Sequence, residues 1–385
     1  MQAPDATSHD RPLAVSAPSD DPAAAVATLA AAFAALDPAL VLVFASPAGA
    51  VPAIVGGLHA ALGPGPRVVG CSSAGEIGPG GYCSDTVTAI AFPRAQFGAG
   101  VTVMGSLQRL PVSDWIADLR ANRRSACRAR KRGCFGVLLA DGLSRQEEVI
   151  VAALDAALPD VPVIGGSAGD GLAFAHTCLA VDDQVLVDAA VLCLIETDLR
   201  IEEVVFAHFR PTDRRMVVTD AAPEDRLILE LNAVPAAEEY ARMVGVPTDA
   251  LSPVVFAKHP LMMRMGGRFY VRAISEATPQ GGLKLMSAIE AGSVLTLGVA
   301  GDPTGGLETL LTSLPGNPSL VLTFDCILRR LAVEHAGLAP EMAVLARRFN
   351  MAGFNTYGEQ HGGMHVNQTL VGLAFLSPDP ENAAG

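Results

Sequence analysis

The sequence predicts an α/β to α+β fold, in which mixed β-sheets are covered by helices and built from a repeated β-α-β unit. Two observations support this prediction. Short apolar runs alternate with helical stretches, and the same order of segments occurs three times along the chain. Half of the residues are hydrophobic, which is enough to form a large core in a chain of 385 residues.

The first copy of the unit begins with the apolar run 41–45, which is too short for a helix and predicts a buried strand. A helical stretch ends at Leu62, a second strand follows at 68–69, and the Gly-rich segment GCSSAGE spans 70–76. The two strands of such a crossover are parallel, and ligands bind beyond the carboxyl ends of such strands. A further strand is expected over 87–92.

The second copy repeats this order. Its first strand is predicted at 136–140, and its helix ends at Leu158. Its second strand, at 163–164, leads into the segment GGSAGD at 165–170. The match to the first copy is close, and the stretch 189–195 is expected to be the later strand.

The third copy has diverged further. Its first strand is predicted at 320–324, and its Gly-rich segment is GFNTYGE at 353–359. The spacing from Glu359 to Phe375 equals the spacing from Glu76 to Phe92, so Thr369 falls opposite Thr86. The three Gly-rich segments are expected to converge and form one ligand cavity.

The predicted domain division has one break, near Leu231 to Pro235, where Asn232 and Pro235 interrupt the pattern before a helix. The division is a flexible N-terminal tail at 1–34, an N-terminal domain at 35–232, a C-terminal domain at 233–378 and a tail at 379–385.

Four separated segments identify a family resemblance. They are GCSSAGEIGPGGY (70–82), DGLSRQEE (141–148), GGSAGD (165–170) and GFNTYGEQ with HVNQT (353–369). In this order they resemble the N- and C-terminal parts of the FIST sensory domain, over residues 35 to 378. The resemblance implies two FIST-type domains and a bacterial small-ligand sensor, often linked to histidine kinases, chemoreceptors or cyclic-di-GMP enzymes. It supplies no catalytic residues, so an enzyme is not expected.

Further segments resemble a subgroup, the haem-binding, nitric-oxide-sensing FIST proteins (NosP). These segments are HFRPT (208–212), RMVVT (215–219) and DCILRR (325–330). The resemblance implies haem b as cofactor and nitric oxide as ligand. It also implies a separate histidine kinase as partner, in two-component signalling connected with cyclic-di-GMP and biofilm formation. The alternative is a haem-free FIST sensor of an amino acid or a similar small carboxylate.

Three histidines are candidate axial ligands of a haem iron, which needs His, Cys, Met or Tyr. His208 lies in an apolar strand run before a Pro turn and is the first choice. His259 precedes the Met-rich run 261–265, and His365 follows the third Gly-rich segment. The alternative interpretation is a hydrogen-bonded structural histidine, and for the Met run a part of the core.

Three arginines, Arg264, Arg272 and Arg329, lie in otherwise apolar or Gly-rich stretches. A buried guanidinium without a partner is costly, so each should meet either a protein carboxylate or the carboxylate of a ligand. The predicted protein partners are Glu76, Asp325 and Glu359. With two further positions of the motifs, Cys326 and Asn355, the predicted ligand pocket comprises Arg264, Arg272, Cys326, Arg329, Asn355, Glu359 and Glu76.

The acids Asp141, Glu147, Glu148 and Asp170 allow a hydrolase as a third hypothesis. The simpler interpretation makes Asp141 the N-terminal cap of a helix, with Glu147 and Glu148 in its first turn. No nucleophile motif, phosphate loop or zinc-ligand spacing supports an enzyme.

The net charge of −13 argues against a nucleic-acid-binding protein, which needs clustered basic residues. No leader pattern and no apolar run long enough for a spanning helix is visible, so a cytoplasmic protein without membrane contact is expected. The sequence leaves a homodimer open.

Overall fold

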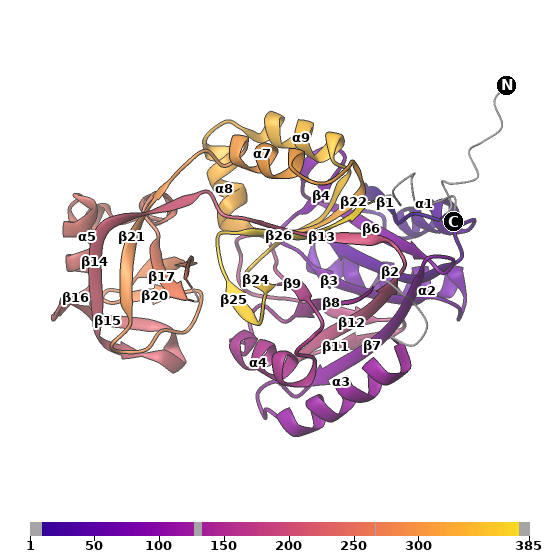
Figure 1. The fold of residues 1–385 in the computed structure, drawn as a ribbon, viewed down its shortest axis with the longest axis horizontal. Coiled ribbons are helices and arrows are strands. Elements are labelled where there is room, and N and C mark those ends of the chain that lie inside the picture. The colour runs from indigo at the N-terminus through magenta and orange to yellow at the C-terminus, as the bar shows by residue number, and fades with distance from the viewer. Residues whose placement is uncertain (1–9, 127–132, 266, 377–385) are drawn as a thin grey trace.

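A computed structural model describes residues 10–126, 133–265 and 267–376. The chain forms two parts, which Figure 1 shows side by side. The larger part, called the body, comprises 13–206 and 305–376 and contains three six-stranded sheets. The smaller part, called the lobe, comprises 209–300. The chain crosses between body and lobe twice, after β13 and after β21.

The three β-α-β units of the body confirm the predicted repeat. In each unit the first two strands are parallel: β2 (Pro38–Ala45) with β3 (Arg67–Ser72), β8 (Gly133–Ala140) with β9 (Val163–Ser167), and β22 (Pro318–Cys326) with β23 (Met351–Thr356). The later strand of each unit pairs antiparallel with the first: β6 (Thr86–Pro93), β12 (Ala189–Thr197) and β26 (Leu370–Leu376). All three later strands were predicted.

Each sheet is completed by strands from the other copies. The hairpin that follows each Gly-rich segment joins the sheet of a different copy: β4 (Glu76–Gly78) and β5 (Gly81–Cys83) join the third sheet, β10 (Leu179–Val181) and β11 (Gln184–Leu186) the first, and β24 (Glu359–His361) and β25 (Met364–Val366) the second. At the edge of each sheet opposite its hairpin lies β1 (Leu13–Pro18) in the first sheet, β7 (Phe97–Gly105) in the second and β13 (Arg200–Phe206) in the third. The three copies therefore exchange hairpins in a closed cycle.

Helices cover the outer faces of the sheets (Figure 1). The crossover helices are α2 (Val51–Leu62), α4 (Glu147–Ala157), and the pair α8 (Ile327–His335) and α9 (Ala339–Arg348). Beside them lie α1 (Pro22–Phe33), α3 (Val112–Ala126) and α7 (Gly305–Thr312). No helix in the described ranges is both long and apolar enough to span a membrane.

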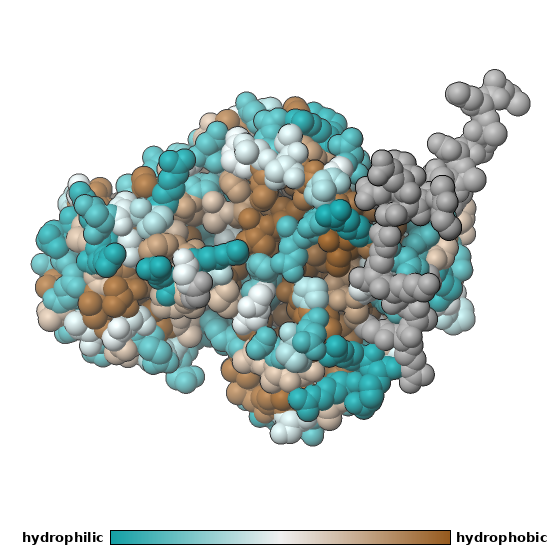
Figure 2. Space-filling model, viewed as in Figure 1, coloured by the Kyte–Doolittle hydropathy of each residue, from teal (hydrophilic) through white to brown (hydrophobic). Residues whose placement is uncertain are grey.

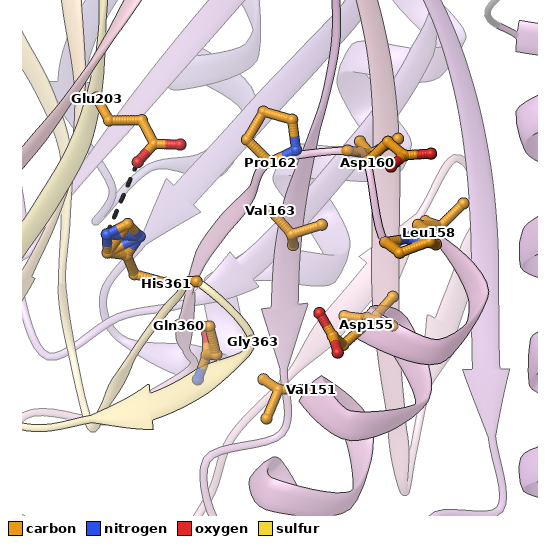
Figure 3. A pocket seen from close by; sticks show the side chains of 14 residues that line it. Val151, Asp155, Leu158, Asp160, Pro162, Val163, Glu203, Gln360, His361 and Gly363 are labelled. Atoms are coloured by element: carbon orange, nitrogen blue, oxygen red, sulfur yellow. Dashed lines mark ion pairs between the residues drawn. The ribbon is translucent and has the colours of Figure 1, made fainter. Parts of the chain in front are cut away.

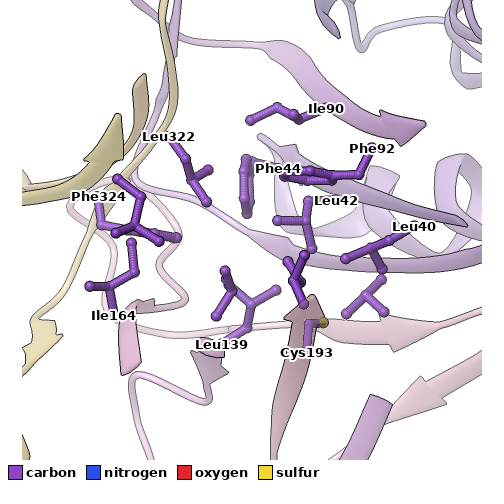
Figure 4. Packing of buried hydrophobic residues seen from close by; sticks show 14 of the residues in the cluster. Leu40, Leu42, Phe44, Ile90, Phe92, Leu139, Ile164, Cys193, Leu322 and Phe324 are labelled. Atoms are coloured by element: carbon purple, nitrogen blue, oxygen red, sulfur yellow. The ribbon is translucent and has the colours of Figure 1, made fainter. Parts of the chain in front are cut away.

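The inner faces of the three sheets share one core (Figure 4). In β2, Leu42 and Phe44 point into this core, whereas Val41 and Val43 pack against the helices. Because both faces are buried, the strand is apolar throughout, as the sequence indicated. Phe44 stacks on Phe354 of the third copy, with ring centroids 4.6 Å apart.

The N-terminal segment corrects one expectation, because the predicted tail at 1–34 is ordered from Leu13 onward. Strand β1 pairs antiparallel with β6, and α1 buries Leu29 and Phe33 completely. The side chain of Asp21 caps α1 by accepting two backbone N–H groups. Residues 1–9 and the predicted tail 379–385 lie outside the described ranges.

The lobe is an eight-stranded antiparallel sheet with two helices, α5 (Ala236–Val244) and α6 (Pro253–Lys258). Its strands are β14 (Phe209–Ala222), β15 (Leu227–Leu231), β16 (Val234–Pro235), β17 (Leu261–Met265), β18 (Arg268–Arg272), β19 (Ile274–Ala277), β20 (Leu283–Leu285) and β21 (Val294–Ala300). The predicted break at 231–235 therefore lies within the lobe, between β15 and β16. Figure 2 shows a notch in the outline of the molecule between the lower edges of the lobe and the body.

Candidate functional site

The three Gly-rich turns converge, as predicted, and they bond directly to one another. Ala74 N–H donates to Asn355 O (2.9 Å), and Asn355 N–H donates to Gly75 O (2.7 Å). Ser167 of the second turn accepts from Tyr357 N–H at 3.1 Å. A Cβ at Gly169 would stand 2.9 Å from the Tyr357 ring, so glycine is needed for this approach. No residue of the three turns lines either of the two cavities described below, so neither of these is the ligand cavity that the turns were predicted to form.

Two buried carboxylates occupy equivalent positions in the first and third turns. Glu76 accepts hydrogen bonds from the hydroxyls of Ser46 (3.0 Å), Ser73 and Thr86 (2.5 Å). Glu359 accepts from Thr356 (2.5 Å) and Thr369 (2.7 Å).

The side-chain hydrogen-bond partners of Glu76 and Glu359 are hydroxyl groups, whereas the sequence predicted arginines. Thr86 and Thr369 match as the spacing predicted, but neither glutamate forms an ion pair with a predicted arginine. Burial raises the pKa of Glu76 to about 7 and that of Glu359 to about 8. Both carboxyls therefore tend to be protonated near neutral pH, which suits a structural role.

Asp170 is the counterpart in the second turn and has different partners. It accepts the N–H groups of Phe174, Ala175 and His176 and the hydroxyl of Tyr357. Its pKa is lowered, because these hydrogen bonds together outweigh the desolvation that acts in the opposite direction. Asp170 thus stabilises a loop on the second turn.

Asp141 is not the helix cap that the sequence suggested. Its side chain accepts Leu143 N–H (3.0 Å), which is an Asx-turn, and the hydroxyl of Thr177 (2.6 Å). The helix α4 begins later, and Glu147 and Glu148 lie in its first turn as predicted. These two acids meet Arg226 of the lobe, with Arg226 Nη2 2.9 Å from Glu148 Oε2. The acids thus link the body to the lobe.

Arg329 has the partner that its burial requires. It is fully buried and forms a bidentate ion pair with Asp325, at 2.6 and 3.0 Å. A third donor reaches Pro303 O at 2.8 Å. Of the two kinds of partner predicted for this arginine, the protein carboxylate is therefore the one present.

Asn355 and Cys326 are buried beside this pair. Asn355 Oδ1 accepts from Arg330 at 3.2 Å, and its Nδ2 donates to Asp325 O at 3.3 Å. Cys326 is completely buried, which raises the pKa of its thiol well above the usual value. Both residues belong to the packed interior of the body rather than to a cavity wall.

The other two predicted arginines lie on the lobe and differ from each other. Arg264 of β17 is exposed, so the expectation that burial would force a partner on it was wrong. Arg272 of β18 is buried, with 7% of its surface exposed. Its contacts are weak: Nη1 lies 3.5 Å from His365 O and Nη2 3.6 Å from Met265 Sδ. Within the described ranges Nε has no partner at all.

His208 lines the larger of two cavities, which has a volume of about 720 Å³. This cavity lies between α6 of the lobe and α8 of the body, and most of its lining is apolar: Pro253, Val254, Ala257, Ala300, Pro303, Leu328, Leu331, Ala332 and Ala336. Lys258, Glu334 and His335 line it as well. Only 5% of His208 is exposed, and its Nδ1 has no hydrogen-bond partner in the described part of the chain. Burial lowers the pKa of His208 to about 3, so the imidazole is neutral.

The other two candidate histidines lie outside this cavity. His259 ends α6 and is half-buried, and its carbonyl accepts the hydroxyl of Tyr240 at 2.7 Å. His365 is buried in β25, where Nδ1 lies 3.4 Å from Gln360 Nε2. The structure therefore separates the three candidates instead of bringing them together.

The smaller cavity, of about 390 Å³, lies at the end of α4 (Figure 3). Its wall carries the acids Asp155, Asp160 and Glu203, and His361 Nε2 lies 3.7 Å from Glu203 Oε2. This acidic lining does not suit an anionic ligand. Across the described residues, no cluster of three or more His, Cys, Asp or Glu side chains is arranged to hold a metal ion.

Comparison with protein-family models identifies the chain. The FIST N domain matches residues 39–234, and the FIST C domain matches 236–361. The protein belongs to the FIST family. No curated protein matches it. As a FIST protein it is a member of a family of small-ligand sensors. The matched segments contain the first three motifs and the GFNTYGEQ part (353–360) of the fourth, whereas HVNQT (365–369) lies after the match.

Several residues that join the body to the lobe or line the larger cavity were given no role in the sequence analysis. Arg226, which joins body and lobe, lies in a loop that has no motif. His335 and Leu331 line the larger cavity, and neither was among the predicted site residues. The DCILRR motif at the start of α8 was the available signal, because one face of that helix lines the cavity. Asn367 lies within the HVNQT motif but was given no role.

Proposed function

We propose that this protein is a haem-based nitric-oxide sensor rather than an enzyme, and that it regulates a separate histidine kinase in the cytoplasm. The observation that carries the proposal is the buried, neutral His208 on the wall of a largely apolar cavity. A cavity of this size lies within the range typical of small-molecule sites, roughly 300–1,000 Å³.

The residues around His208 fit a haem group. A haem iron takes a neutral imidazole nitrogen as an axial ligand. Leu328, Leu331 and Val254 supply apolar surface for a porphyrin. Lys258 supplies a cation for a propionate. When bound, the haem would provide the iron that takes up a diatomic gas.

The position of the cavity suggests how occupancy reaches a partner. One wall, α6, belongs to the lobe, and the other wall, α8, belongs to the body. A ligand that prefers one placement of these helices increases the population of that placement. We propose that the kinase distinguishes the two populations.

The test is reconstitution of the purified protein with haemin, followed by visible spectroscopy. The expected result is a Soret band that shifts on addition of nitric oxide to the reduced protein. His208→Ala should abolish or strongly shift the band. His259→Ala and His365→Ala are matched controls, since both histidines lie outside the cavity. Absence of the band, or an unchanged band in His208→Ala, would sink the proposal.

The kinase step has its own measurement. Autophosphorylation of the purified partner kinase should change when the haem-loaded protein is added, and nitric oxide should alter that change. The His208→Ala protein should lose the response to nitric oxide. An equal response in the variant would show that the cavity does not carry the signal.

A further inference from the structure

The smaller cavity, at the end of α4, carries negative charge on two opposite sides (Figure 3). On one side of Pro162 and Val163 lies Glu203 of β13. On the other side lie Asp155, in the last turn of α4, and Asp160, in the loop that follows. None of the described residues that line this cavity is a lysine or an arginine. Its wall therefore suits a ligand with a positive charge at each end.

The end of α4 adds to the negative charge on its side of the cavity. The last carbonyl groups of a helix carry a partial negative charge, and α4 has no basic residue in its last turn. Asp155 stands over the turn between β24 and β25, because a Cβ at Gly363 would lie 3.3 Å from Asp155 Oδ1. Within the described chain no ion pair holds Asp155, so its charge is left for a cation.

The neighbours of the other two acids neutralise them only weakly. His361 Nε2 lies 3.7 Å from Glu203 Oε2, but burial lowers the pKa of His361, so its ring is neutral near pH 7. Arg123 Nη2 lies 3.8 Å from Asp160 Oδ2, where the Asp160 side chain is 81% exposed. Such an exposed, loose ion pair contributes little and yields readily to a competing cation.

A buried amide on the same wall has an acceptor to spare. Gln360 lines the cavity and is only 1% exposed. Its Nε2 donates to Ser167 Oγ at 2.9 Å and to Gly358 O at 3.3 Å. Its Oε1 is buried and has no donor in the described part of the chain. An unsatisfied buried carbonyl oxygen is costly, and an N–H group of a ligand would satisfy it.

The surface between the charged sides is apolar. The side chains that form it are Val151, Leu154, Leu158, Pro159, Val161, Pro162 and Val163. A chain of methylene groups would bury its surface against these residues, which a hydrated metal ion could not do. The acids also stand apart, since no cluster of three or more His, Cys, Asp or Glu among the described residues is arranged to hold a metal ion.

We infer that the smaller cavity is a binding site for an aliphatic diamine or polyamine. Glu203 takes the ammonium group at one end of the ligand, and Asp155 and Asp160 take the ammonium group at the other. The methylene chain between them packs on Pro162 and Val163. This site shares no lining residue with the His208 cavity, so it is independent of the haem proposal.

The test is isothermal titration calorimetry of the purified protein with 1,6-diaminohexane, 1-aminohexane and magnesium chloride. The buffer is HEPES with sodium chloride, which contains no primary amine and keeps the ionic strength constant. We expect the diamine to bind at least tenfold more tightly than the monoamine, because only the diamine reaches both charged sides. Haemin should leave the affinity for the diamine unchanged.

Exposed acids can be replaced without disturbing the fold, which makes the variants decisive. Glu203→Gln should weaken binding of the diamine at least fivefold and remove its preference over the monoamine. Glu202→Gln is the matched control, because Glu202 is the next residue of β13, lies outside the cavity and pairs with Arg200 at 2.8 Å. This control should bind the diamine as the wild type does.

Four outcomes would overturn the inference. They are a lack of diamine binding, equal affinities for the diamine and the monoamine, tighter binding of magnesium than of the diamine, and an equal loss in Glu202→Gln and Glu203→Gln. The last result would mean that the net charge of −13 attracts cations in general, without a built site.

Discussion

Arg329 and Arg272 are both buried arginines, yet only one of them has a carboxylate partner. Arg329 lies inside the body, and its N–H groups donate to Asp325, to Pro303 O and to the hydroxyl of Tyr82. Arg272 lies at the junction with the lobe, where its Nε has no acceptor within the described chain. Burying an unpaired cation is costly, so a protein retains one only where something offsets that cost. The difference separates an arginine whose charge is paired inside the body from a buried arginine at the junction whose Nε has no acceptor in the described chain.

The largest expected effect on stability comes from breaking the ion pair between Arg329 and Asp325. Arg329→Met leaves Asp325 buried without its cation, and this should lower the free energy of unfolding by about 3–5 kcal/mol. Urea denaturation at neutral pH measures the change. The double variant Asp325→Leu with Arg329→Met removes both charges and should recover much of the loss. A loss below about 1 kcal/mol in the single variant would contradict the assigned role.

The second expected effect concerns Glu76 and Glu359, the two glutamates that are buried among hydroxyl groups in the body. Their folded-state pKa values, about 7 for Glu76 and about 8 for Glu359, lie above the ordinary value of 4.5. Between pH 5 and 8 the folded state therefore holds more protons than the unfolded state, and stability falls as pH rises. Below the ordinary value, where both states are protonated, the stabilising contribution is fully present.

Glu359→Gln isolates this contribution. The neutral amide keeps the shape of the protonated carboxyl, so the pH dependence between 5 and 8 should shrink by on the order of a few kcal/mol. Urea denaturation across that pH range is the measurement. Glu308→Gln, at an exposed position of α7, is the matched control and should keep the wild-type profile. An unaltered profile in Glu359→Gln would mean that its carboxyl titrates normally.

The same contrast explains what the sequence could and could not predict. The repeat was predictable, because apolar runs and Gly-rich turns are local patterns, and the spacing even paired Thr86 with Thr369. The hairpin exchange was not, since strands of three residues carry no signal for which sheet they join. Asp141 was misassigned because an Asx-turn and a helix cap use the same residue type.

The candidate site was only partly predictable, for a physical reason. Arg264, Arg272 and Arg329 stand in similar apolar surroundings in the sequence, yet one is exposed, one is paired and one is buried without a carboxylate. Which outcome occurs depends on contacts across the junction, such as the bridge between Val271 and Asn367. His208 was predicted from a resemblance, whereas the cavity that it lines, with a wall on α8, could be found only from the fold.

The smallest expected effect on stability is also the sharpest test of the comparison. Arg272→Met removes a buried cation that leaves no stranded carboxylate behind, since Glu148 keeps Arg226 and Ala288 N–H as partners. We therefore expect the free energy of unfolding to change by less than about 1 kcal/mol or to rise. Urea denaturation, run beside Arg329→Met, gives the answer. A loss as large as that of Arg329→Met would mean that Arg272 holds the folded chain together, and the two arginines would then not differ in role.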